Sequence, residues 1–142
     1  MRAAWFKDFS ISLVCWLTYG YFGLALFWAY YNSINPALEL ATSSFASSNP
    51  VLTNIILYAH DAFVNFLLSI PLAYVLFRFF GVRSIFAVFT SVVIVSLIMS
   101  RGSFGLLIDS PMFAMYWNII VMLASLPLAL IAVKALNSRG PA

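Results

Sequence analysis

Residues 51–77 read VLTNIILYAHDAFVNFLLSIPLAYVLF. A helix needs about 20 apolar residues to cross a hydrocarbon layer of about 30 Å, and this run exceeds that length. Asp61 is its one carboxylate. The apolar residues are continuous and do not alternate with polar ones, which argues against a half-buried strand. The run therefore predicts a transmembrane helix.

Three further apolar runs, at about 9–31, 84–100 and 112–133, resemble this one. Of the 142 residues, 64% are hydrophobic and 8% are charged, and the mean hydropathy is +1.03. Soluble domains carry about 25% charged residues, so lipid is the expected solvent of this chain. A chain this short offers too few strands to close a barrel in a bilayer. We predict one all-α domain, 1–142, that is a polytopic membrane protein with four transmembrane helices.

The basic residues are unevenly distributed around these runs. Only Arg101 is predicted on the outer side. The bases predicted on the inner side are Arg2, Lys7, Arg78, Arg83, Lys134 and Arg139. This positive-inside pattern predicts that both the N-terminus and the C-terminus are cytoplasmic, and it explains the net charge of +3 without a nucleic-acid partner. The first run is too long for a signal peptide and lacks a cleavage site, so we expect it to be retained. Short loops with basic flanks favour a bacterial inner (plasma) membrane.

A short motif occurs twice. Ser69-Ile70-Pro71-Leu72-Ala73 in the second run matches Ser125-Leu126-Pro127-Leu128-Ala129 in the fourth, and bases follow both at the same offsets. Coincidence among apolar residues, combined with the positive-inside rule, is the alternative explanation. Duplication predicts two tandem helical hairpins, with repeat halves 1–80 and 81–142, related by a pseudo-twofold axis along the membrane normal. Pro71 and Pro127 would then bend their helices at one depth.

Turn and capping residues indicate where the helices end. The pairs Asn49-Pro50 and Ser110-Pro111 each place a capping residue before a proline, which is typical of a helix start. Gly81 permits a tight turn, so we expect the second and third helices to be antiparallel neighbours. Asn35-Pro36 predicts a short interfacial helix that runs to Thr42.

Asp61 is the main candidate for a functional residue, because it is predicted near the middle of the membrane. An ionised acid at that depth costs several kcal/mol unless protein or water surrounds it. At 100° per residue, several polar side chains share its face within an arc of about 80°. This polar stripe consists of Asn54, Tyr58, Asp61, Asn65 and Ser69. It predicts either hydrogen bonding between helices or a route for protons or ions.

Two further polar residues are secondary candidates. His60 precedes Asp61 but lies about 100° away from the stripe, so the sequence does not favour a His60–Asp61 dyad. A neutral imidazole bonded to a neighbouring helix is the simplest interpretation, with a proton relay or an axial cofactor ligand as alternatives. Asn118 in the fourth run is expected to form a hydrogen bond in helix packing.

The sequence offers little for catalysis. It contains neither H-E-x-x-H nor G-x-S-x-G, and the single histidine excludes a multi-histidine metal centre. We therefore expect no enzyme activity, no metal and no cofactor. The preferred hypothesis is a small membrane protein that acts by assembly, as a homo-oligomer or as an accessory subunit of a larger complex of membrane-protein chains. The alternative is a small proton- or cation-coupled transporter or channel that uses the polar stripe.

Overall fold

The computed structural model describes residues 2–31, 36–99 and 113–138, and within these ranges the chain is helical and contains no strand. The predicted all-α fold class is confirmed. The helical elements are α1 (Arg2–Thr18), the π-helical turn η1 (Tyr19–Leu24), α2 (Ala25–Tyr31), α3 (Pro36–Thr42), α4 (Ser44–Ser48), α5 (Pro50–Arg78), α6 (Ile85–Met99) and α8 (Phe113–Ser138).

The helix starts agree in part with the capping pattern. The short helix α3 covers the predicted residues, and α5 begins at Pro50 with Asn49 as its N-cap residue. The Asn49 side chain, however, makes no capping hydrogen bond and donates from Nδ2 to the Phe45 carbonyl at 3.5 Å. The predicted Ser110-Pro111 start lies outside the described residues.

Two helices are long and apolar enough to cross a membrane, namely α5 and the Ile119–Ser138 part of α8. Helix α6 is apolar but shorter. Only 11% of the most apolar window of α5 is buried. The core helix of a soluble protein would bury most of such a window, so α5 does not resemble one.

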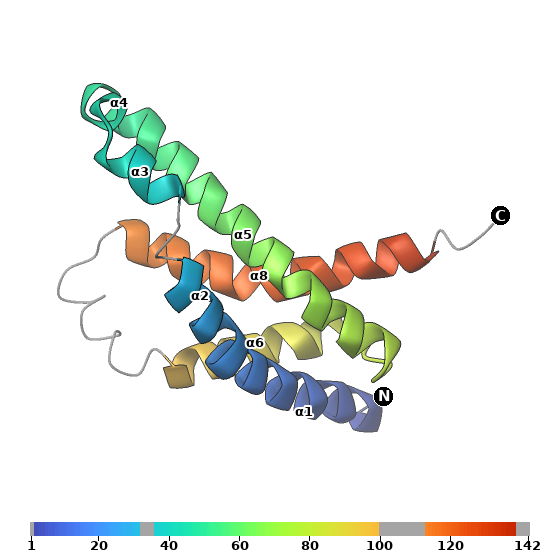
Figure 1. Cartoon of the computed structure of the whole chain (residues 1–142). Coiled ribbons are helices and arrows are strands. Elements are labelled where there is room, and N and C mark those ends of the chain that lie inside the picture. Colours follow the sequence, from blue (N-terminus) through green and yellow to red (C-terminus); the bar gives the residue numbers. More distant parts are fainter. Residues whose placement is uncertain (1, 32–35, 100–112, 139–142) are drawn as a thin grey trace.

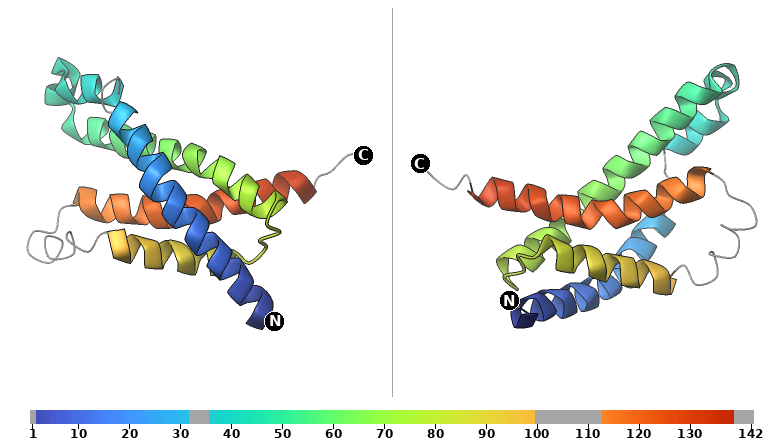
Figure 2. Two further views of the ribbon diagram at one scale, coloured as in Figure 1. Left: turned by 60° about the horizontal axis from the view of Figure 1, so that its bottom comes forward. Right: turned by 180° about the vertical axis from the view of Figure 1, so that it is seen from behind.

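The first predicted helix forms one long, continuous helical segment that crosses the other helices (Figure 2). We call this segment, which runs from α1 through η1 to α2, the first rod or the α1–α2 rod. Helix α1 passes directly into η1 and then into α2. Single π turns inside α-helices are uncommon and often occur at functional positions. A Cβ atom at Gly23 would lie 3.1 Å from the Tyr19 ring, so the glycine leaves room for that ring.

The helices pack in the spatial order α5, α8, α6, α1 (Figure 1). Helix α8 contacts α5 on one side and α6 on the other, and α6 also contacts α1. The expectation that α5 and α6 are packed neighbours is therefore wrong. Gly81 does adopt a left-handed conformation (φ 64°) in the connecting turn. Small residues of α6, including Ala87 and Ser91, are fully buried, and α6 packs closely against α1 and α8 instead.

The buried core lies near the end of the molecule that contains the start of α1, the α5–α6 turn and the C-terminal end of α8, at the right of Figure 1. We call this the turn end. The core residues are Trp16, Leu72, Ala73, Leu76, Val82, Val88, Val92, Val95, Leu126, Ala129, Leu130 and Val133. At the opposite end α5 diverges from α8 and carries α3 and α4 beside it.

The two copies of the repeated motif lie in the contacting helices α5 and α8. Ser69 and Ser125 are both buried, and each donates its hydroxyl to the carbonyl four residues earlier. Ala73 and Ala129 are also buried in both copies. The prolines differ, because Pro71 is exposed and Pro127 is buried. The superposition of one half on the other stays a prediction.

Candidate functional site

The polar stripe of α5 becomes progressively more sheltered toward the turn end. Ser69 is 2% exposed. Tyr58, Asp61 and Asn65 are half-buried, and Asn54 is exposed. The five residues therefore share a face without sharing one environment.

Two members of the stripe form hydrogen bonds within their own helix. Asn65 Nδ2 donates to the Asp61 carbonyl at 2.8 Å, and Ser69 Oγ donates to the Asn65 carbonyl at 2.9 Å. Such bonds to the preceding turn satisfy a polar side chain where water is scarce. These two contacts stabilise α5 itself and do not join it to another helix.

His60 bonds a neighbouring helix. The Tyr31 hydroxyl of α2 lies 2.7 Å from His60 Nε2, and the two rings stack with their centroids 5.9 Å apart. The hydrogen bond between helices that the simplest interpretation expects is thus present. Both contacts hold the imidazole, which belongs to α5, against α2.

The other imidazole nitrogen faces Asp61. His60 Nδ1 lies 3.6 Å from Asp61 Oδ1, which is within ion-pair distance when the imidazole is protonated. Nδ1 is buried and has no hydrogen-bond partner among the described residues. The two side chains thus approach each other without forming a hydrogen bond, and the expectation that they form no dyad stays a prediction. Adjacent Cβ atoms do diverge by about 100°, but the imidazole is long enough to turn back toward the carboxylate.

This arrangement places Tyr31, His60 and Asp61 in one row. If the Tyr31 hydroxyl donates to Nε2, the imidazole carries its proton on Nδ1, which lies 3.6 Å from Asp61 Oδ1. If the imidazole is protonated on both nitrogens, the tyrosine oxygen accepts instead. The row can therefore hold a proton in more than one position.

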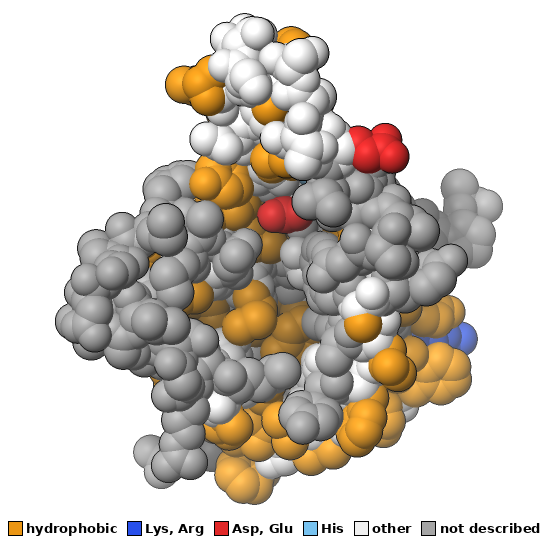
Figure 3. All heavy atoms as spheres, turned by 60° about the vertical axis from the view of Figure 1, so that its left-hand side comes forward, with side chains coloured by type: hydrophobic (Ala, Val, Ile, Leu, Met, Phe, Trp, Pro, Cys, Tyr) orange, Lys and Arg blue, Asp and Glu red, His pale blue; other side chains and the backbone are white. Residues whose placement is uncertain are grey.

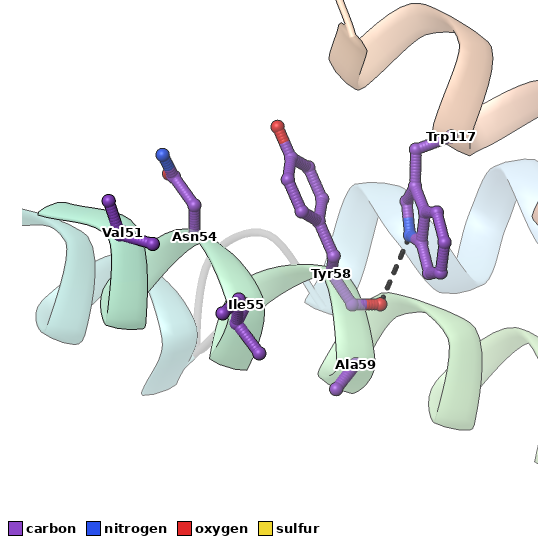
Figure 4. Close-up of a pocket in the computed structure, with 6 residues that line it drawn as sticks. All are labelled: Val51, Asn54, Ile55, Tyr58, Ala59 and Trp117. Atoms are coloured by element: carbon purple, nitrogen blue, oxygen red, sulfur yellow. Dashed lines mark hydrogen bonds between the residues drawn. The ribbon is translucent and has the colours of Figure 1, made fainter.

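A groove lies on α5 beyond this row, away from the turn end (Figure 4). Figure 4 shows Asn54 and Tyr58 projecting to the same side of α5, while Trp117 reaches toward them from α8. Trp117 Nε1 donates to the Tyr58 carbonyl at 3.1 Å, and the two rings lie 5.7 Å apart. The groove has a volume of about 430 Å³ and is otherwise lined by Val51, Ile55 and Ala59.

A hydroxyl from the π turn ties α5 to the first rod. Tyr19 donates to the Leu68 carbonyl at 2.6 Å. Pro71 lies three residues further along α5 and lacks the N–H that would bond the Leu67 carbonyl. The Tyr19 contact thus joins α5 one residue away from the carbonyl that Pro71 leaves without a helical donor.

Asp8 is a buried acid that sequence reasoning missed. It is 7% exposed, and its Oδ2 accepts the backbone N–H groups of Arg83 at 3.0 Å and Ser84 at 2.9 Å. Ser84 Oγ accepts the N–H of Ala87 at 3.2 Å. Asp8 and Ser84 together cap the N-terminus of α6. Lys134 of α8 donates to the Arg83 carbonyl, so three helices meet at this turn.

A periodic signal for Asp8 exists in the sequence. Asp8, Ser12 and Trp16 recur every four residues, and all three are buried on one face of α1. This spacing is easily overlooked, because Asp8 follows Lys7 and directly precedes the apolar run that begins at Phe9. In that position it resembles one of the charged residues that flank a transmembrane helix.

Some expected residues fall outside this description. The side chain of Asn118 and the whole of Arg101 lie outside the described part of the chain. Within the described ranges, no group of three or more His, Cys, Asp or Glu side chains could hold a metal ion.

Comparison with known proteins gives no relative: no family model, no curated protein and no solved structure matches this chain.

Proposed function

We propose that this chain is a multi-pass protein of a bacterial inner membrane that acts by assembly, as a homo-oligomer or as an accessory subunit of a larger membrane complex. The four spans are the α1–α2 rod, α5, α6 and α8. In this proposal α5 binds a helix of a second membrane-protein chain.

The observation that carries the proposal is the exposed half of α5 beyond the core. Val51, Ile55 and Phe63 are exposed there, as an apolar solvent would allow. Asn54 is also exposed, and the Asp61 side chain is 36% exposed. Lipid accepts the apolar side chains but penalises the amide and the carboxylate, whereas a partner helix can bond both.

The distribution of polar and apolar side chains over the surface supports a membrane-spanning α5. Figure 3 shows a projecting tip, where α3 and α4 lie, and hydrophobic side chains below it. Most of the tip is white, the colour of backbone and of side chains that are neither hydrophobic nor charged. Helix α4 contains Ser44, Ser47 and Ser48, which are exposed. A polar tip above an apolar body suits a protein whose α5 crosses the hydrocarbon and ends in the interfacial region.

Cross-linking at α5 tests the assembly. In a Cys15→Ser background, Ile55→Cys is expected to give a cross-linked product in native membranes, either a dimer of this chain or an adduct with a second chain of fixed mass. Leu26→Cys is the matched control, because Leu26 is exposed at a comparable distance from the outer end of its own helix. A purified protein that is monomeric in mild detergent, together with equal cross-linking at both positions, would contradict the proposal.

The proposed orientation places both termini in the cytoplasm. The described bases Lys7, Arg78, Arg83 and Lys134 lie in segments near the turn end, which supports this assignment. A cytoplasmic reporter fused after Ala142 is expected to be active, and a periplasmic reporter is expected to be active within residues 40–48. An active periplasmic reporter at Ala142 would overturn the topology.

The tandem-hairpin repeat belongs to the same proposal. In this proposal α1 and α5 of the first half correspond to α6 and α8 of the second half. The matching serine bonds of the two motifs support the same relation.

A second candidate function is proton or cation transport. The row of Tyr31, His60 and Asp61 favours it, because the hydroxyl, the imidazole and the carboxylate follow one another at 2.7 and 3.6 Å. A row of this kind can pass a proton along when water reaches both of its ends.

A further inference from the structure

A hollow opens at the turn end, where the α5–α6 turn meets the end of α8. It is lined by Phe77, Arg83, Lys134, Asn137 and Ser138 and has a volume of about 480 Å³. Pockets for small ligands have volumes of about 300–1,000 Å³. The hollow is thus large enough for a small anionic group.

Two cations line this hollow, and among the described residues that line it there is no acid. The Arg83 guanidinium carbon lies 5.9 Å from the centre of the Phe77 ring. The Lys134 ammonium donates a hydrogen bond to the Arg83 backbone carbonyl. The positive charge of Arg83 disfavours the charged form of Lys134, and a bound anion offsets that repulsion.

Asp8 is an acid whose charge acts on Lys134, and it does not line the hollow. Its Oδ2 accepts two backbone N–H groups of the turn. These bonds and the Lys134 contact involve backbone atoms of Arg83 and Ser84, so the Arg83 guanidinium is not needed for them. The charge of the Arg83 side chain is therefore separable from the fold of the turn.

We propose that this hollow binds a phosphate group, carried either by a phospholipid headgroup of the inner leaflet or by free phosphate. The guanidinium fork matches two phosphate oxygens, and the ammonium adds a point charge. Asn137 donates one amide hydrogen to the Val133 carbonyl and retains a second one for an oxygen of the ligand. Binding of a phospholipid headgroup rests on the proposal that the protein lies in a membrane. Binding of phosphate from either source does not depend on the proposal that the chain assembles with other chains.

The rival explanation is that these bases only set topology. Any base near an anionic membrane adds a diffuse attraction, and Arg78 does so as well as Arg83. Arg78 is exposed at the same end and does not line the hollow. Arg78→Gln is therefore the matched control.

The test uses the full chain, purified and delipidated in a neutral detergent. Native mass spectrometry measures binding of phosphatidylglycerol, of diacylglycerol with the same chains, and of oleic acid as an anion without phosphate. Inorganic phosphate is titrated alone and as a competitor. Arg83→Gln and Lys134→Gln are each expected to weaken phosphatidylglycerol binding about tenfold, Arg83→Lys several-fold, and Arg78→Gln less than twofold. Circular dichroism and the oligomer mass confirm that each variant is folded and assembled as before.

Each outcome decides the proposal. Binding of phosphatidylglycerol above diacylglycerol and oleic acid, lost in the Arg83 and Lys134 variants, supports a lipid phosphate. Binding of inorganic phosphate alone, with the same dependence on both residues, supports a soluble phosphate. Equal affinity for all three lipids without phosphate binding, or an equal loss in Arg78→Gln, overturns the site. Because the oligomer mass is measured separately, this failure is distinguishable from a failure of the assembly proposal.

Discussion

Asp8→Ala is expected to lower the free energy of unfolding by about 3 kcal/mol, because it removes a buried carboxylate and leaves two backbone N–H groups at the start of α6 without their acceptor. The same substitution removes a negative charge from the positive end of the α6 dipole. The two acceptor bonds also fix α1 to the α5–α6 turn, so their loss separates segments that are far apart in the sequence.

The measurement is unfolding of the purified protein in mixed micelles, followed by circular dichroism. Asp8→Asn keeps an acceptor oxygen but loses the charge, so a loss of about 1 kcal/mol is expected. Glu39→Ala is the control, since Glu39 is an exposed acid of α3, and it should change stability by less than about 0.5 kcal/mol. Equal stability of Asp8→Ala and the wild type would show that the cap contributes nothing.

Substitutions at Asp61 are expected to separate the two candidate functions. Asp61→Asn keeps the shape and most hydrogen bonding but removes the titratable proton, whereas Asp61→Leu removes both. If α5 binds a partner helix through Asp61, the Asn variant should retain the oligomer mass, and the Leu variant should weaken assembly about tenfold or more.

The transport hypothesis predicts the opposite dependence. Asp61→Asn should abolish pH-dependent flux in proteoliposomes while the assembly remains intact, because the carboxylate at the end of the Tyr31–His60–Asp61 row no longer accepts a proton. Glu39→Gln is the matched control for loss of one acid outside the row. Unchanged assembly and unchanged flux in both Asp61 variants would contradict both functions.

The helices themselves were predictable because long apolar runs carry the signal locally. The start of α5 at Pro50 and the short helix Pro36–Thr42 follow from proline positions. The packing order was not predictable in the same way. Gly81 specifies a turn, but whether α5 and α6 then touch depends on how closely α8 and α1 fit against α6.

The site was predictable only where it depends on one helix. The shared face of Asn54, Asp61 and Ser69 follows from helical periodicity, although the sequence does not show that the outer end of this face is exposed. The contact of His60 with Tyr31 joins two helices and depends on tertiary packing. Asp8 was missed for the same reason, since the N–H groups it accepts lie in a distant turn.

The π turn at Tyr19–Leu24 sets the rotational phase of the first rod. A π turn amounts to one residue inserted into an α-helix, and each residue of an α-helix turns the chain by about 100°. Everything after Leu24 is therefore rotated by about that angle relative to an uninterrupted helix. Without this inserted residue, Tyr31 would point away from His60, so the row across α2 and α5 depends on a local irregularity located about two turns of helix earlier.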